Sequence, residues 1–251
     1  MALLAGRTAL VTGGSRGIGR AVVERLAADG AVVVFGYRTD DAAAKQVEES
    51  VRAAGGTAHG VRADLVERDG MAGLLADTGT WLTEQGHDGL DIMVNNAALD
   101  FRPIPLAEMT DDDFDRVLAV NTRAVFVAMR YAAKSLRDGG RVVNVSTLNT
   151  VRSAPGLAAY AASKGALEQL TAVGAHEMGR RGITVNTVSP GATDTDLLRA
   201  TNSEDGLRMI EQWTPLGRIG EPADVADVIA FLCGPDARWV SGQNLRATGG
   251  L

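Results

Sequence analysis

The chain has 251 residues, of which 45% are hydrophobic and 22% charged, which suits one large α/β domain with a substantial core. The formal net charge of −6 argues against nucleic acid as a partner, and no apolar run approaches the roughly 20 residues that span a bilayer. The first residues lack the pattern of a signal peptide, and the single cysteine, Cys233, cannot form an intrachain disulfide. We therefore expect a cytoplasmic protein with no membrane partner. The three histidines show no metal-ligand spacing, so no metal site is expected.

Short β-rich runs alternate with helical patterns along the whole chain. The candidate strands are Thr8–Thr12, Val32–Phe35, Thr57–Arg62, Ile92–Val94, Arg141–Val145 and Thr184–Ser189. The candidate helices are Ile18–Asp29, Ala42–Ala54, Arg68–Glu84, Asp111–Leu136, Ala159–Arg180 and Pro222–Cys233. Several strands are apolar at consecutive positions, as parallel strands covered on both faces are. The alternation predicts an α/β fold, with a doubly wound parallel sheet of about seven strands and helices on both faces.

The first predicted strand leads into a glycine-rich turn, TGGSRGIG at residues 12–19, and a helix follows. Glycines at 13, 17 and 19 allow a tight turn and let the backbone approach a pyrophosphate. The N-terminus of the helix offers free N–H groups and the positive end of its dipole to the same phosphates. This placement between strand and helix predicts a dinucleotide site.

Tyr160 and Lys164 are four residues apart in a predicted helix, so their side chains lie on one face and can converge. One ammonium about 4 Å from a phenol contributes on the order of 4 kcal/mol at an effective dielectric near 20. That is enough to lower a phenol pKa from about 10 to about 7. By itself the pair also fits an ordinary helix surface with a solvated lysine. Its meaning therefore depends on the rest of the site.

The spacing T-G-x-x-x-G-x-G resembles that of the short-chain dehydrogenase/reductase family, in its short branch, and the resemblance covers essentially the whole chain. It implies a single Rossmann-type domain over residues 1–251. Asn95-Asn96-Ala97-Ala98 is similar to the family's Asn-Asn-Ala-Gly element, Asp64 to its adenine-binding aspartate, and Pro190-Gly191 with Thr195 to its nicotinamide segment. The chain departs from the family pattern at Ala247-Thr248, where Val-Asp is usual. The resemblance implies a cofactor-binding set of Gly13, Ser15, Arg16, Gly17, Ile18, Gly19, Tyr37, Arg38, Asp64, Leu65, Asn95, Ala97, Tyr160, Lys164, Pro190, Gly191, Thr193 and Thr195.

The charges after the second strand favour NADP(H) over NAD(H). An NAD enzyme places an Asp or Glu there to bind the ribose 2′-hydroxyl, whereas this chain has Tyr37 followed by Arg38. Arg16 in the glycine turn adds a second guanidinium on the same side. Two guanidiniums without a carboxylate suit the 2′-phosphate of NADP(H).

The family resemblance implies a catalytic Asn, Ser, Tyr and Lys. Asn121, Tyr160 and Lys164 match three of them. Counting back from the tyrosine places the fourth at Thr147, with the neighbouring Ser146 as the alternative. In the implied mechanism the two hydroxyls bind a carbonyl oxygen, NADPH delivers hydride, and Tyr160 donates the proton. Lys164 lowers the tyrosine pKa and binds the nicotinamide ribose, and the backbone of Asn121 holds a water in a proton relay.

Residues 194–215 occupy the position of the family's substrate lid, with an amphipathic helix expected there. The residues expected to form an apolar pocket are Leu197, Leu198, Met209, Ile210, Trp213, Leu99, Phe101 and the loop Leu148–Leu157. The pattern is similar to that of 3-oxoacyl-acyl-carrier-protein reductases, which implies reduction of a ketone, or a 3-oxoacyl thioester, to a secondary alcohol (EC 1.1.1.-). An oxidising sugar or alcohol dehydrogenase and a catalytically silent NADP-binding protein are the alternatives. The resemblance also implies a homotetramer formed through Asp111–Leu136 and Ala159–Arg180.

Overall fold

In the computed structural model, which describes residues 2–99 and 103–251, seven parallel strands form one sheet in the order β3-β2-β1-β4-β5-β6-β7. Their bounds are β1 Thr8–Thr12, β2 Val32–Tyr37, β3 Thr57–Arg62, β4 Ile92–Asn95, β5 Arg141–Val145, β6 Thr184–Pro190 and β7 Asn244–Ala247. The strand order reverses between β1 and β4, and ligands bind at such a reversal in open α/β sheets, outside the carboxyl ends of the strands. The predicted α/β class, a Rossmann-type doubly wound parallel sheet, is confirmed.

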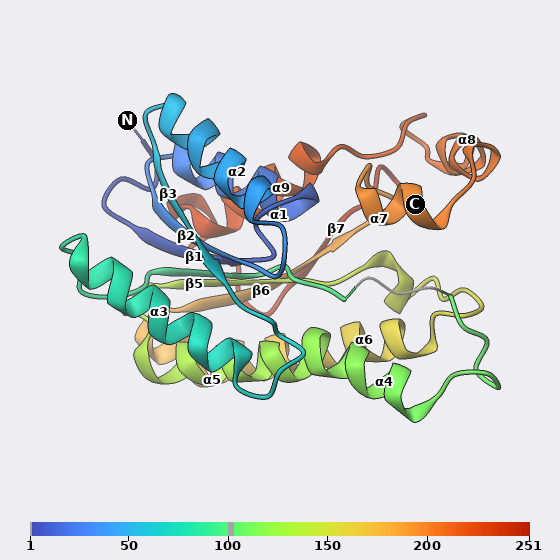
Figure 1. Cartoon of the computed structure of the whole chain (residues 1–251), viewed down its shortest axis with the longest axis horizontal. Coiled ribbons are helices and arrows are strands. Elements are labelled where there is room, and N and C mark those ends of the chain that lie inside the picture. The colour runs from blue at the N-terminus through green and yellow to red at the C-terminus, as the bar shows by residue number, and fades with distance from the viewer. Residues whose placement is uncertain (1, 100–102) are drawn as a thin grey trace.

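Helices cover both faces of the sheet (Figure 1). One face carries α1 Gly17–Ala28, α2 Asp41–Ala53 and α9 Pro222–Cys233. The other carries α3 Gly70–Glu84, α4 Asp111–Leu118, α5 Val125–Ser135 and α6 Ala158–Met178. Two short helices, α7 Asp196–Thr201 and α8 Glu204–Trp213, lie beyond the sheet, near the C-terminus of the chain (Figure 1).

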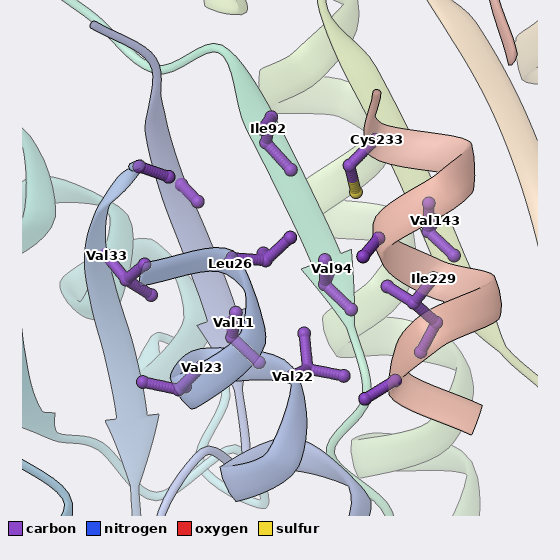
Figure 2. Packing of buried hydrophobic residues seen from close by; sticks show 14 of the residues in the cluster. Val11, Val22, Val23, Leu26, Val33, Ile92, Val94, Val143, Ile229 and Cys233 are labelled. Carbon is purple, nitrogen blue, oxygen red and sulfur yellow. The ribbon is translucent and has the colours of Figure 1, made fainter. Parts of the chain in front are cut away.

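Two apolar layers hold the helices to the sheet. Figure 2 shows the first layer, in which Leu26 of α1 and Ile229 of α9 pack over Val11, Val94 and Val143 of the strands. The second layer packs α3, α5 and α6 against the opposite face. The central strands are covered on both sides, so their consecutive residues are buried and mostly apolar, as in β1 and β4. The core therefore fixes the strand ends that carry the site.

Cys233 lies in the first layer, at the end of α9 (Figure 2). Burial raises the pKa of its thiol to about 12, so it stays protonated and acts as a small apolar residue. Within the described part of the chain, no helix combines the length and apolarity needed to cross a membrane.

The structure departs from the predicted elements in three places. β7, at Asn244–Ala247, is absent from the predicted ranges because it is short, partly exposed and free of β-branched residues. The predicted helix over 111–136 is divided by a π-helical turn at Ala119–Ala124. The single helix expected within 194–215 is two helices, each begun by a hydroxyl cap, Thr195 for α7 and Ser203 for α8.

Candidate active site

A cleft of about 920 Å³ opens at the carboxyl ends of β1, β2, β4, β5 and β6, between the glycine-rich turn and the helices α7 and α8. Its lining includes every residue expected to bind a cofactor except Asn95. Thr147, Tyr160 and Lys164 of the expected catalytic group also line it, whereas Asn121 lies behind the wall. The fold thus brings together segments that are far apart in the sequence.

Asn95, which the sequence led us to expect at the cofactor, does not line the cleft. The residue is 1% exposed, and its Nδ2 donates to Oδ1 of Asn144 at 2.8 Å inside the sheet. The next residue, Asn96, lines the cleft instead. Asn96 Nδ2 donates to the carbonyl oxygens of Thr12, at 2.9 Å, and Gly13, at 3.2 Å. Neighbouring side chains at a strand end point in opposite directions, which places Asn96 on the glycine turn.

The glycine turn has the shape and polarity of a phosphate cradle. A Cβ on Gly19 would lie 2.0 Å from the carbonyl oxygen of Gly13, so no larger residue fits there. Gly13 itself has φ of +69°, a conformation that favours glycine. No side chain caps the start of α1, and its first turn carries no acid, so its N–H groups face the cleft unopposed by negative charge. These residues fit the pyrophosphate of a dinucleotide.

The adjoining end of the cleft carries guanidinium groups. Arg16 and Arg38 line it, and both are exposed. The nearest following carboxylate, Asp40, caps α2 by accepting a hydrogen bond of 2.9 Å from the backbone N–H of Ala43. The carboxylate of Asp64 accepts from the N–H of Val66 at 2.9 Å. Since these two acids are engaged by the backbone, the arrangement suits an additional phosphate on the ribose.

Lys164 is buried in the middle of the site. Its Nζ donates to the carbonyl oxygen of Val145 at 2.7 Å and lies 6.0 Å from the centroid of the Tyr160 ring. Burial lowers the pKa of Lys164 from 10.5 to about 8 because the ammonium is removed from water. The pair predicted from the four-residue spacing therefore converges in space.

The pKa of Tyr160 differs from the expectation that Lys164 lowers it. Burial raises the pKa of this phenol above 10.0, and a hydrogen bond with the Thr147 side chain opposes the rise only in part. The ammonium of Lys164 points to the backbone of Val145, which limits its effect on the phenol. Tyr160 is therefore protonated at neutral pH and able to donate.

The strand end separates the two candidate hydroxyls. Ser146 Oγ donates to Oε1 of Glu168 on α6 at 2.7 Å. Thr147, by contrast, hydrogen-bonds with Tyr160 through its side chain. Its backbone is extended, with φ −161° and ψ 153°, so successive side chains alternate in direction. The geometry therefore brings Thr147, and not Ser146, to the phenol.

Asn121 lies in the π-helical turn, with no exposed surface. Its Oδ1 accepts from the backbone N–H of Leu99 at 3.0 Å, and its Nδ2 donates to Ser163 Oγ at 3.1 Å. Ser163 Oγ in turn donates to the carbonyl oxygen of Tyr160 at 2.7 Å. Single π turns within α-helices are frequent at functional sites, and this one links the cleft loop to the helix that carries the tyrosine.

The opposite end of the cleft is largely apolar. Of the residues expected there, Leu99, Leu197, Leu198, Ile210 and Trp213 line it, together with Leu148 and Leu157 of the expected loop. Met209 lies outside the lining and is 48% exposed, and Phe101 falls outside the described residues. Arg152 is the basic side chain at this end.

Two residues of the site were not predicted. Asn96 belongs to the predicted Asn-Asn element, and the alternation of side chains along a strand is the signal that distinguishes it from Asn95. Glu168 lies one helical turn beyond Lys164, and that spacing is the signal that places it on the same face of α6. In the described part of the chain, no three His, Cys, Asp or Glu side chains gather in a way that could hold a metal ion.

Known proteins match this chain over nearly its whole length. Residues 13–251 match the family model described as enoyl-(acyl carrier protein) reductase. The chain is 40% identical to an uncharacterised oxidoreductase of Methylorubrum extorquens, with 100% of both chains covered. It is 38% identical to versicolorin reductase 1 of Aspergillus parasiticus, covering 98% of this chain and 97% of the other.

Solved structures resemble this chain in both sequence and fold. The angucycline C-6 ketoreductase LanV with bound NADP is 41% identical, with a TM-score of 0.94 over 99% of this chain and 96% of that one. A short-chain dehydrogenase/reductase of Serratia marcescens is 38% identical, with a TM-score of 0.91 over 99% of this chain and 98% of that one.

Proposed function

This chain belongs to the short-chain dehydrogenase/reductase family, and we propose that it reduces a ketone on an extended, largely apolar ring system to a secondary alcohol. It is an NADP(H)-dependent oxidoreductase of class EC 1.1.1.-. The observation that carries the proposal is that Thr147 and Tyr160 both line the wall of one cleft, with the Thr147 side chain near enough to the phenol to lower its pKa. Two adjacent O–H groups are what a developing alkoxide requires.

NADP(H) would be held along the carboxyl ends of the strands. The turn from Gly13 to Gly19 and the start of α1 suit its pyrophosphate, and Arg16 and Arg38 suit its 2′-phosphate. The other residues proposed to contact it are Ser15, Gly17, Ile18, Tyr37, Asp64, Leu65, Asn96, Ala97, Pro190, Gly191, Thr193 and Thr195. When bound, NADPH supplies the hydride that adds to the carbonyl carbon.

The chain's own residues act on the carbonyl oxygen. Tyr160 keeps its proton at neutral pH because burial raises its pKa, and it donates that proton to the oxygen as negative charge develops. Thr147 donates a second hydrogen bond to the same atom. Lys164 would hold the ribose, and its ammonium, 6.0 Å from the centroid of the Tyr160 ring, would partly offset the charge left on the phenolate. Its lowered pKa, about 8, makes it suited to returning a proton from solvent along a path past Asn121.

The apolar end of the cleft supports an extended substrate. Leu148, Leu197, Ile210 and Trp213 present carbon surface there, and a single cation, Arg152, lies among the described lining residues of that end. Such pockets take ligands that bury most of their surface. The names of the relatives agree, since they include a hydroxynaphthalene reductase-like protein, named for a fused-ring compound, beside a versicolorin reductase and an angucycline ketoreductase. The 3-oxoacyl thioester expected from the sequence is the second candidate; the family model is described by an enoyl substrate on an acyl carrier protein, which shares the thioester but not the ketone.

We further propose that residues 194–215 act as a substrate lid. Neither α7 nor α8 contains a buried residue, so little packing holds them in one position. Arg16 Nη1 lies 4.0 Å from Asp196 Oδ2, which brings the start of the lid to the glycine turn. We also propose that the protein is cytoplasmic.

The proposed homotetramer has some support on the surface. Phe126 of α5 is 47% exposed and Val173 of α6 is 54% exposed, which leaves apolar groups on the helices expected to pair. Light scattering of the purified protein tests this directly. A mass equal to one chain would refute the tetramer.

The activity is tested by measuring NADPH consumption with fused-ring ketones, 3-oxoacyl thioesters and simple ketones. The same substrates are tested with NADH in place of NADPH, and with the Tyr160→Phe variant as the control. Turnover of a fused-ring ketone that Tyr160→Phe abolishes supports the proposal. Faster oxidation of sugars or alcohols by NADP⁺ would favour the dehydrogenase. Tight NADPH binding without turnover in any arm would indicate a catalytically silent protein.

A further inference from the structure

Three successive residues at the end of β5 each interact with a different residue of α6, the first two through hydrogen bonds. The pairs are Val145 with Lys164, Ser146 with Glu168, and Thr147 with Tyr160. The three helix residues are spaced four apart, so they form one row along the helix. Two members of the row, Tyr160 and Lys164, belong to the proposed chemistry. Glu168 does not touch the reacting atoms, so the proposed reaction gives it no role.

One oxygen of Glu168 binds the chain on both sides of Thr147. Its Oε1 accepts from Ser146 Oγ at 2.7 Å and from Thr150 Oγ1 at 2.8 Å. Thr150 Oγ1 also lies 3.1 Å from the carbonyl oxygen of Thr147, but a hydroxyl has a single proton to donate. A carboxylate is the stronger acceptor, so the bond to Glu168 takes precedence.

The orientation of Thr147 depends on this segment. Its Oγ1 accepts from the backbone N–H of Asn149 at 3.2 Å, which leaves its own proton for the cleft. The segment from 146 to 150 is a strand end and one 3₁₀ turn, in which the N–H of Ser146 donates to the carbonyl oxygen of Val188 at 2.8 Å and the N–H of Thr150 makes a long bond of 3.5 Å to that of Thr147. A rotation there would turn the Thr147 hydroxyl away from the phenol. The two bonds to Glu168 oppose such a rotation.

We propose that Glu168 is a positioning residue of this site, whose carboxylate holds the Ser146–Thr150 segment so that the Thr147 hydroxyl stays against Tyr160. Its effect on turnover rests on the proposed reductase function. Its effect on the Thr147–Tyr160 hydrogen bond does not, and can be measured on the folded protein alone.

The experiment compares Glu168→Ala, Glu168→Gln and the control Gln169→Ala, an exposed neighbour on α6. We expect Glu168→Ala to lower kcat about 10- to 100-fold, because small displacements of a catalytic group have effects of this size. The NADPH Kd should stay unchanged. Glu168→Gln keeps an acceptor oxygen and should restore most of the activity. The NMR shift of the Tyr160 Cζ carbon, assigned with Tyr160→Phe, should move in Glu168→Ala and not in Gln169→Ala.

A second comparison removes the donors instead of the acceptor. Ser146→Ala/Thr150→Val should reproduce the loss in kcat, and adding Glu168→Ala should then change it by less than about twofold, since coupled residues are non-additive. This pair keeps the test decisive if Glu168→Ala does not fold. Additive losses, weaker NADPH binding or an unmoved Tyr160 signal would overturn the inference. Failure of the wild-type protein to reduce any ketone would refute the proposed function only, because the NMR comparison still decides the role of Glu168.

Discussion

Lys164 Nζ donates a 2.7 Å hydrogen bond to the carbonyl oxygen of Val145 in the interior of the protein, where the lysine is 1% exposed. A single carbonyl replaces the water that an ammonium normally binds. The lowered pKa of Lys164, about 8, records the energetic cost of this burial.

Lys164→Met should make the protein inactive but more stable. At neutral pH the shift from 10.5 to about 8 corresponds to a cost of about 3 kcal/mol in the wild-type protein. Methionine removes that cost but leaves the Val145 oxygen unpaired, at about 1–2 kcal/mol. We expect a net stabilisation of about 1 kcal/mol at neutral pH, measured by urea unfolding.

The pH dependence of that difference is fixed by the direction of the pKa shift. Between about 8 and 10.5 the unfolded chain holds the Lys164 proton more tightly than the folded one, so wild-type stability rises with pH. Lys164→Met has no such titrating group, so the difference in stability between this variant and the wild-type protein should shrink as the pH rises through that range. A constant difference between about pH 7 and pH 10 would contradict the assignment.

Substitutions at the strand end should separate the two hydroxyls. Thr147→Ala should lower kcat about 100-fold or more, as loss of an oxyanion donor does, whereas Thr147→Ser should retain most of the activity. Ser146→Ala should cost only several-fold, because Ser146 acts through Glu168. Steady-state kinetics with saturating NADPH measures all three. A larger loss in Ser146→Ala than in Thr147→Ala would reverse the assignment.

Arg38→Asp should weaken NADPH binding and improve NADH binding. The exposed guanidinium is proposed to meet the 2′-phosphate, and a charge-assisted hydrogen bond of this kind contributes about 1.5–3 kcal/mol, or about 10- to 100-fold in Kd. Fluorescence titration with both cofactors checks this. Asp40→Asn serves as the control, because that carboxylate caps α2. If Arg38→Asp kept the wild-type preference for NADPH over NADH, the 2′-phosphate would have to bind at other residues.

Gly19→Ala should abolish cofactor binding while leaving most of the fold intact. The added Cβ would lie 2.0 Å from the Gly13 carbonyl oxygen, so the turn must open. Gly79→Ala is the matched control, since no atom lies within 4 Å of its Cβ position and the helix α3 favours alanine. Binding of NADPH should be lost in the first variant and retained in the second.

Much of the fold followed from local patterns. The strands β1, β4, β5 and β6 are continuous buried runs rich in apolar residues, and buried parallel strands have that signature. β7 has no such signature, because its residues alternate between exposed and partly buried. The π-helical turn around Asn121 was also beyond prediction, since it adds one residue per turn without changing the composition of the helix.

The sequence predicted which residues form the site but not where their side chains point. Spacing alone placed Tyr160 and Lys164 on one face, and the count from Tyr160 placed Thr147 at the strand end. Neither the spacing nor the count could show that the ammonium of Lys164 points to the carbonyl oxygen of Val145. They also could not show that burial is the largest influence on the pKa of the Tyr160 phenol. The sequence pattern also did not distinguish Asn95 from Asn96, because that depends on which face of the sheet each side chain meets.

The contrast between α6 and the helices α7 and α8 has a consequence for how this enzyme can change. Tyr160 and Lys164 are carried by a helix with many buried residues, whereas the helices that border the apolar end of the cleft have none. Substitutions in α7 and α8 should therefore cost less folding energy than substitutions in α6, since positions outside the buried core tolerate change better. Random libraries confined to these two helices should yield mostly folded proteins with altered substrate choice. In evolutionary terms, new substrates are accessible to this chain without a change in its chemistry.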